Sequence, residues 1–176
     1  NGSAQMSGVA GMINAVSNQA LTVLERPVVA KAFGAASIVP GAATTLTITL
    51  TNANAVPITG VAFTDVFPAS PGAMTLADAT IANSCGGALA DSGGGGLGTG
   101  DAGLQLGGGT MPASGSCAIT VNVTAATPGT YTNALAAGAV TSANASSSAT
   151  GASANLLVTA SATIAKAFAP STIAAD

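Results

Sequence analysis

Histidine and tryptophan are absent from the 176-residue sequence, and only 5% of its residues are charged. Without histidine, the chain has no imidazole base, no Ser-His-Asp triad and no imidazole metal ligand. The three cations, Arg26, Lys31 and Lys166, are too few to neutralise the phosphates of a nucleic acid. Aromatic residues make up 3% of the chain, too few to stack nucleic-acid bases. The sequence therefore predicts a binding or structural protein, not an enzyme, with no cofactor and no bound metal.

Long hydrophobic runs are missing as well, although the mean hydropathy is +0.59. Thr, Ser, Asn or Gly interrupts every apolar stretch before it reaches the roughly 18 residues that a membrane-spanning helix needs. We therefore expect no membrane span in these residues, and a surface built from small neutral side chains. The chain opens on Asn1-Gly2-Ser3 without a secretion signal, as a fragment of a longer protein would.

The two cysteines, Cys85 and Cys117, each lie among small polar residues, in NSCGG and SGSCAIT. Two free thiols in such a setting would be unusual in a reducing compartment. The sequence therefore predicts a disulfide and an extracellular location. Two unrelated buried thiols are the alternative. The bond would close a loop of about thirty residues, worth about 3–4 kcal/mol in the loop-entropy model.

An internal repeat organises the chain. The segment Leu21–Ile38 aligns without gaps to Leu156–Ile173, and the shared Lys-Ala-Phe uses both lysines of the sequence. One full repeat is therefore predicted over residues 25–159. Residues 1–24 would be the tail of a preceding repeat or an N-terminal extension, and residues 160–176 the first strand of the next repeat or a donor strand. Chance similarity in an alanine-rich chain is the alternative.

Within the repeat, apolar and polar residues alternate with a period of two. The clearest runs are residues 44–51 and 117–124, and Pro-Gly or Pro-Ala turns separate the alternating segments. Short alternating strands with this spacing predict an all-β fold, a β-sandwich. The alternate threonines are expected to be exposed. The predicted core consists of Val29, Phe33, Leu46, Ile48, Leu50, Val61, Phe63, Ile119, Val121, Val123 and Leu135.

Several of these segments also carry a family resemblance. The signature elements are Lys31-Ala32-Phe33, Pro40-Gly41, Thr51-Asn52, Thr64-Asp65 and the later run from Met111 to Cys117. Over about residues 21–176 the chain resembles the conserved repeat domain of bacterial surface proteins, the domain-of-unknown-function eleven family and its close relatives. The resemblance implies an immunoglobulin-like β-sandwich repeat, flanked by strand segments of neighbouring repeats. Such repeats are usually strung in tandem on secreted or surface-attached proteins, and the resemblance implies no known activity.

Three polar residues, Lys31, Asp65 and Asn133, share the apolar face of their predicted strands. An unpaired buried charge is costly, so these side chains are expected to meet one another. Some surface immunoglobulin-like domains use such a trio to form an intramolecular isopeptide bond, in which the lysine attacks the asparagine carboxamide and the acid shuttles protons. The alternative is a lysine whose head reaches the surface and pairs with Asp65 at a domain junction.

The glycine-rich segment from Asp91 to Asp101 invites three interpretations. A phosphate-binding loop would need a lysine that is absent here. The segment matches a calcium-binding nonapeptide motif only in part, because its aspartate is displaced by one position and no second copy follows. A flexible hairpin loop inside the disulfide ring is the favoured interpretation.

Together these features predict a structural repeat of an extracellular bacterial fibre, stalk or adhesin on the cell surface. Its partners would be copies of itself or adjacent repeats of the same chain, joined head to tail by strand contacts. The predicted assembly strand carries Ile164, Lys166 and Phe168 on one face, and could dock in cis or in trans. The alternative is an adhesin module that binds a carbohydrate or a host receptor, which would need an exposed aromatic or acidic cluster.

Overall fold

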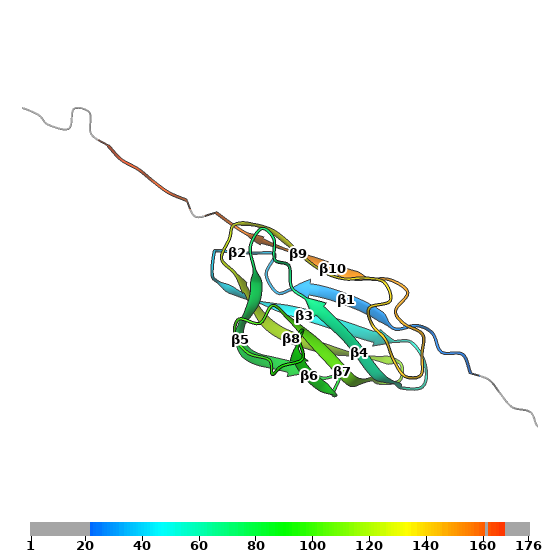
Figure 1. The fold of residues 1–176 in the computed structure, drawn as a ribbon. Coiled ribbons are helices and arrows are strands. Elements are labelled where there is room, and N and C mark those ends of the chain that lie inside the picture. The colour runs from blue at the N-terminus through cyan, green and yellow to red at the C-terminus, as the bar shows by residue number, and fades with distance from the viewer. Residues whose placement is uncertain (1–21, 161, 168–176) are drawn as a thin grey trace, which may run out of the picture.

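The computed structural model describes residues 22–160 and 162–167, and within them it contains ten strands and no helix. The fold is the predicted immunoglobulin-like β-sandwich (Figure 1). The four-stranded sheet has the order β1 (Val28–Phe33), β3 (Ala43–Asn52), β8 (Gly115–Ala125) and β5 (Met74–Asn83). One three-stranded sheet consists of β4 (Ile58–Val66), β7 (Gly103–Met111) and β6 (Ala88–Asp91). The other consists of β2 (Ser37–Ile38), β10 (Ala152–Val158) and β9 (Gly129–Leu135).

The alternating runs form the two central strands of the four-stranded sheet. In β3 and β8 the registered pairs Leu46–Val121 and Ile48–Ile119 face the core. All the predicted core residues are buried except Phe33, which is half-buried near the end of β1 and packs against the core. All three sheets contribute to this one hydrophobic cluster.

The outer face of β3 is less exposed than predicted. Thr47 and Thr49 are half-buried, because β3 lies between β1 and β8 and their side chains cover it. The hydroxyl oxygens of Thr47 and Thr120 on β8 lie 3.2 Å apart, within hydrogen-bond distance. Threonines on a central strand therefore contact one another as cross-strand pairs instead of facing only water.

A bulge in β4 decides which of its side chains reach the core. The register with β7 shifts between Thr59 and Val61, and Gly60 between them has a φ of 63°. As a result, Ile58 and Val61 both point inward although they are three residues apart. In a regular strand, inward-pointing residues are two apart. The inward parity then continues along the strand to Asp65, which is fully buried. Without the bulge, a strand with Ile58 inside would place Asp65 outside.

The chain enters and leaves the sandwich at opposite ends (Figure 1). All ten strands lie within the predicted repeat of residues 25–159. Residues 22–27 precede β1 and residues 162–167 follow β10, and neither segment forms a strand. The predicted tail segment up to residue 21 and the predicted assembly residue Phe168 lie outside the described residues. In the part of the chain that the structure describes, no helix could span a membrane.

Candidate functional site: a buried lysine, aspartate and asparagine

The structure brings together the three polar residues that the strand parity placed in the core. Lys31 comes from β1, Asp65 from β4 and Asn133 from β9, so each belongs to a different sheet. The side chains of Lys31 and Asp65 are both 0% exposed, and Asn133 is buried as well. The cluster therefore joins the three sheets in the interior of the sandwich, away from water.

Each member of this cluster contacts the other two. The Lys31 ammonium nitrogen Nζ lies 2.5 Å from Asp65 Oδ1 and donates to it. Lys31 Nζ also contacts Asn133 Oδ1. Asn133 Nδ2 donates to Asp65 Oδ2 at 3.3 Å, which closes the triangle. Among the described residues, no buried side-chain polar atom lacks a hydrogen-bond partner.

Burial moves both titratable members of the cluster towards their neutral forms. Desolvation lowers the pKa of Lys31 below its usual value, although the nearby Asp65 opposes this shift. Desolvation raises the pKa of Asp65 above its usual value, against the opposing effect of Lys31 and the Asn133 hydrogen bond. A neutral lysine is a nucleophile and a protonated carboxyl is an acid. The site therefore places an amine, a carboxyl group and a carboxamide in direct contact.

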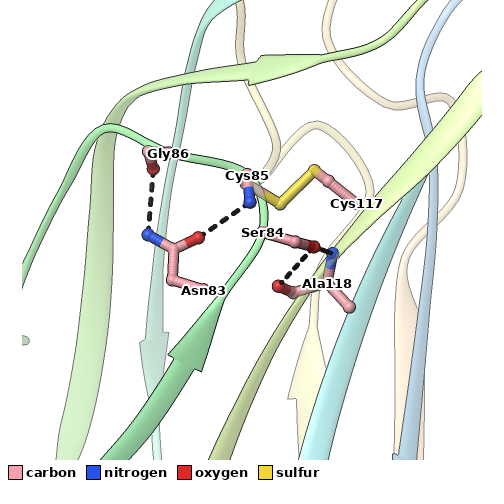
Figure 2. Close-up of a disulfide and its surroundings, with 6 residues drawn as sticks. All are labelled: Asn83, Ser84, Cys85, Gly86, Cys117 and Ala118. Carbon is pink, nitrogen blue, oxygen red and sulfur yellow. Dashed lines mark hydrogen bonds between the residues drawn. A yellow bond between two sulfur atoms is a disulfide. The ribbon is translucent and has the colours of Figure 1, made fainter.

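Cys85 and Cys117 form the disulfide that the sequence predicts (Figure 2). Cys117 lies in β8 and Cys85 in the loop between β5 and β6, so the bond fastens this loop to the four-stranded sheet. Two neighbours that the sequence analysis did not single out hold the loop in place. Ser84 Oγ accepts a hydrogen bond from Ala118 N at 2.8 Å, and Asn83 Oδ1 accepts one from Cys85 N at 2.9 Å. Both residues belong to the NSC segment around Cys85.

The glycine-rich loop is a hairpin connection inside the disulfide ring, as favoured from the sequence. It joins β6 to β7, which pair in antiparallel orientation. Asp91 Oδ1 accepts hydrogen bonds from Gly93 N at 2.6 Å and Gly95 N at 3.1 Å, and Asp101 Oδ2 accepts one from Gly98 N at 2.6 Å. Within residues 22–160 and 162–167, no group of three or more cysteine, aspartate or glutamate side chains could hold a metal ion.

The predicted assembly segment lies outside the sandwich. Ile164 is 97% exposed, whereas its repeat counterpart Val29 in β1 is 5% exposed. Lys166 is the counterpart of Lys31. Residues 160–176 are predicted to form a strand by pairing with a neighbouring unit. That pairing stays a prediction.

Comparison with solved structures finds similar folds at low sequence identity. The chain resembles the non-cellulosomal cohesin from the hyperthermophilic archaeon Archaeoglobus fulgidus, with 9% identity, a TM-score of 0.51, and coverage of 75% of this chain and 91% of the cohesin. It also resembles a chain of the CaDoc0917–CaCohA2 complex, with 15% identity, a TM-score of 0.50, and coverage of 75% and 100%. At this level of identity the likeness concerns the fold alone.

Sequence comparison assigns the chain to a family. No curated protein matches it in sequence. The resemblance to the domain-of-unknown-function eleven family stays a prediction. A family model described as Domain of unknown function (DUF7933) matches residues 27–158, which include all ten strands. Because this match covers most of the sequence, the chain belongs to the DUF7933 family.

Proposed function

We propose that the chain is a structural repeat of an extracellular bacterial fibre, stalk or adhesin, in which successive sandwiches join head to tail. The observation that carries this proposal is a second copy of the β1 sequence at the far end of the molecule. The segment around Ile164 repeats the segment around Val29, and it leaves the sandwich opposite the point where the chain enters (Figure 1). A second sandwich built on this copy would continue the line of the first.

The connection between two such sandwiches would be short. Thr163 corresponds to Val28, where β1 begins, and β10 ends at Val158. Residues 159–162 are therefore all that separates β10 from the next first strand. The start of this linker is already held, because Thr159 N donates a hydrogen bond to Ile38 O at 2.9 Å. A linker of this length would keep neighbouring sandwiches in contact and limit their relative motion.

The chemistry of the surface suits an extended extracellular array. Three cations and six anions are the only charged side chains, and Lys31 and Asp65 are buried. Adjacent units would therefore repel one another little. A disulfide between Cys85 and Cys117 also fits an oxidising compartment outside the cell.

A ligand-binding adhesin module is the second candidate. It is supported by the likeness to a chain of the CaDoc0917–CaCohA2 complex, which was solved with its partner. A shallow hollow over β4 and β7, lined by Ala62, Thr64, Gln105 and Thr141 among others, offers a surface for a ligand. The large exposed apolar residues among those described are all aliphatic, so this surface lacks the aromatic cluster expected of a carbohydrate site. Retention of the chain on one ligand of a glycan or protein array would favour this candidate.

The head-to-tail proposal can be tested with a chain of two repeats, made by continuing residue 168 directly into a second copy of residues 34–176. Hydrogen exchange is then measured at residues 163–168 and compared with residues 28–33 as the internal standard. We expect residues 163–168 to become as protected as β1, because they would pair with the second copy of β3. In the original chain the same amides should exchange fast.

Assembly between separate chains is tested with the original protein. Sedimentation and electron microscopy would compare the full chain with a chain that ends at Thr159 and with Ile164→Asp. Val39→Asp is the matched control, since Val39 is also an exposed β-branched aliphatic residue, 62% accessible, but lies in a turn of the sandwich. Loss of oligomers in the first two variants alone supports assembly in trans. Fast exchange in the two-repeat chain, together with a full chain that stays monomeric, would overturn the proposed function.

A further inference from the structure

We propose that Lys31 and Asn133 become joined by an isopeptide bond between Nζ and the side-chain carbonyl carbon Cγ, and that Asp65 transfers the protons. This inference concerns the interior of one sandwich and does not depend on the proposed head-to-tail assembly. It rests on the geometry of the three side chains, on their burial, and on the presence of an amide that a simple ion pair would not need.

The first observation is the arrangement of Asp65 between the two nitrogen atoms. Its Oδ1 lies 2.5 Å from Lys31 Nζ, which would attack. Its Oδ2 lies 3.3 Å from Asn133 Nδ2, which would leave. One carboxyl group therefore contacts both the nucleophile and the leaving group. Lys31 Nζ also contacts Asn133 Oδ1, so the carbonyl of the carboxamide is turned towards the amine. The carbon Cγ that the amine would attack is bonded to this oxygen, so the amine lies beside the reacting group.

The second observation is the environment. Lys31 and Asp65 side chains have no exposed surface, and the surrounding strands contribute Val29, Val61 and Tyr131 to the same core. Burial favours the neutral amine and the neutral acid, which are the protonation states that the reaction uses. The absence of bulk water protects the carboxamide and the product from hydrolysis.

The reaction balances without an oxidant, a metal or any co-reactant. The proton that Lys31 holds in its charged form passes to Asp65, which leaves a neutral amine and a protonated carboxyl group. The Nζ lone pair then forms a bond to Asn133 Cγ. The carboxyl group protonates Nδ2, the Cγ–Nδ2 bond breaks with its electron pair, and ammonia leaves. The Asp65 carboxylate then accepts a further proton from Nζ, which leaves the new amide neutral. The products are one secondary amide and one molecule of ammonia.

A buried Lys31–Asp65 ion pair is the competing explanation, and it accounts for only part of the site. An ion pair needs two charged groups, and burying both is costly unless their remaining hydrogen bonds are satisfied. Asn133 could satisfy one such bond on each partner. However, an ion pair loses no atoms, so it would leave the mass of the protein unchanged. The mass of the protein therefore decides between the two explanations.

The experiment is an intact-mass measurement on the purified, reduced and denatured wild-type chain. We expect a mass below the sequence mass by one ammonia molecule. A mass equal to that of the sequence would overturn the proposal. This test uses the wild-type protein, so it does not depend on whether any variant folds.

Digestion with trypsin then locates the lost ammonia. Arg26 precedes a proline, so the sites open to trypsin are Lys31 and Lys166. Trypsin does not cut after an acylated lysine, and we expect residues 1–166 to remain one fragment. Separate fragments 1–31 and 32–166 would overturn the proposal even if ammonia were lost, because the loss would then lie elsewhere, for example at Asn1-Gly2.

Two variants test the roles of the individual groups. Asp65→Asn keeps the size of the side chain but cannot transfer protons in the same way, and Lys31→Arg removes the nucleophile. Both are expected to have the full sequence mass. Lys166→Arg is the matched control, since it changes the repeat counterpart of Lys31 outside the sandwich, and it should keep the ammonia loss. An unchanged ammonia loss in Lys31→Arg would overturn the assignment.

Discussion

Ile48 and Thr51 lie on the same strand, β3, and differ in what their side chains contact. Ile48 is 1% exposed within the core, whereas Thr51 is exposed on the outer face. We expect Ile48→Ala to lower the free energy of unfolding by about 2–5 kcal/mol, because it leaves a cavity among packed side chains. Thr51→Ala should change it by less than about 0.5 kcal/mol. Urea titration of both variants measures the difference, and equal costs would contradict the assigned parity of β3.

The buried cluster shows how far single residues can be placed from sequence. The alternation Val29-Lys31 and Tyr131-Asn133-Leu135 was enough to predict that these polar residues face the core. Their meeting point required the topology, because β1, β4 and β9 belong to three different sheets. The orientation of the Asn133 side chain decides that its oxygen faces Lys31 and its nitrogen faces Asp65. The sequence pattern does not predict this orientation.

At the scale of the strand, Gly60 decides the parity of β4. Its φ of 63° is rarely adopted by other residues, and a Cβ at this position would lie 2.8 Å from the Cβ of Ala143. We therefore expect Gly60→Ala to destabilise the fold by at least about 1 kcal/mol. Gly96→Ala is the matched control, because its added methyl group meets no atom within 4 Å. Thermal unfolding of both variants tests this, and similar melting temperatures would show that the bulge tolerates a side chain.

The strands differ in how readily their sequences reveal them. β3 and β8 alternate cleanly, and both were predicted. β7 contains Gly107–Gly109, and β5 has a mixed burial pattern along its length, so neither strand shows the period-two pattern. Their pairing with β4 and β8 holds them in the sheet. The sequence therefore predicted the sandwich and the central strands of its four-stranded sheet. By contrast, β5 at the edge of that sheet and β7 in the middle of another depended on tertiary contacts.

The disulfide acts at the scale of elements, since it ties the β5–β6 loop to β8. The cysteines are 32 residues apart in sequence. Reduction should lower the free energy of unfolding by about 3–4 kcal/mol, chiefly by releasing this loop in the unfolded chain. Denaturant titration with and without a reductant measures the change. Thiol titration of the natively purified, denatured protein is the control, and two free thiols would contradict the bond itself.

At the scale of the whole molecule, the position of the chain ends determines how the sandwich would carry a pulling force. The chain enters before β1 and leaves after β10 at the opposite end (Figure 1). In a tandem array, tension would therefore pass along the sandwich from one end to the other. A bond between Lys31 and Asn133 would connect β1 directly to β9, which pairs with β10 over its whole length. The residues between the two bonded positions would then be shielded from extension.

This shielding can be measured by stretching single molecules, with Asn133→Ala as the unlinked comparison. Lys31 and Asn133 are 102 residues apart, and 32 of these lie within the disulfide ring, which leaves 70 that can be released while the disulfide is intact. At roughly 3.5 Å per residue, the variant should extend about 250 Å further than the wild-type chain when it unfolds. With the disulfide reduced, the difference should grow to about 360 Å. Comparing the two chains cancels the end-to-end length of the fold, since both share the same sandwich. Equal extension of both chains would mean that the force path along β1 and β9 contains no covalent link.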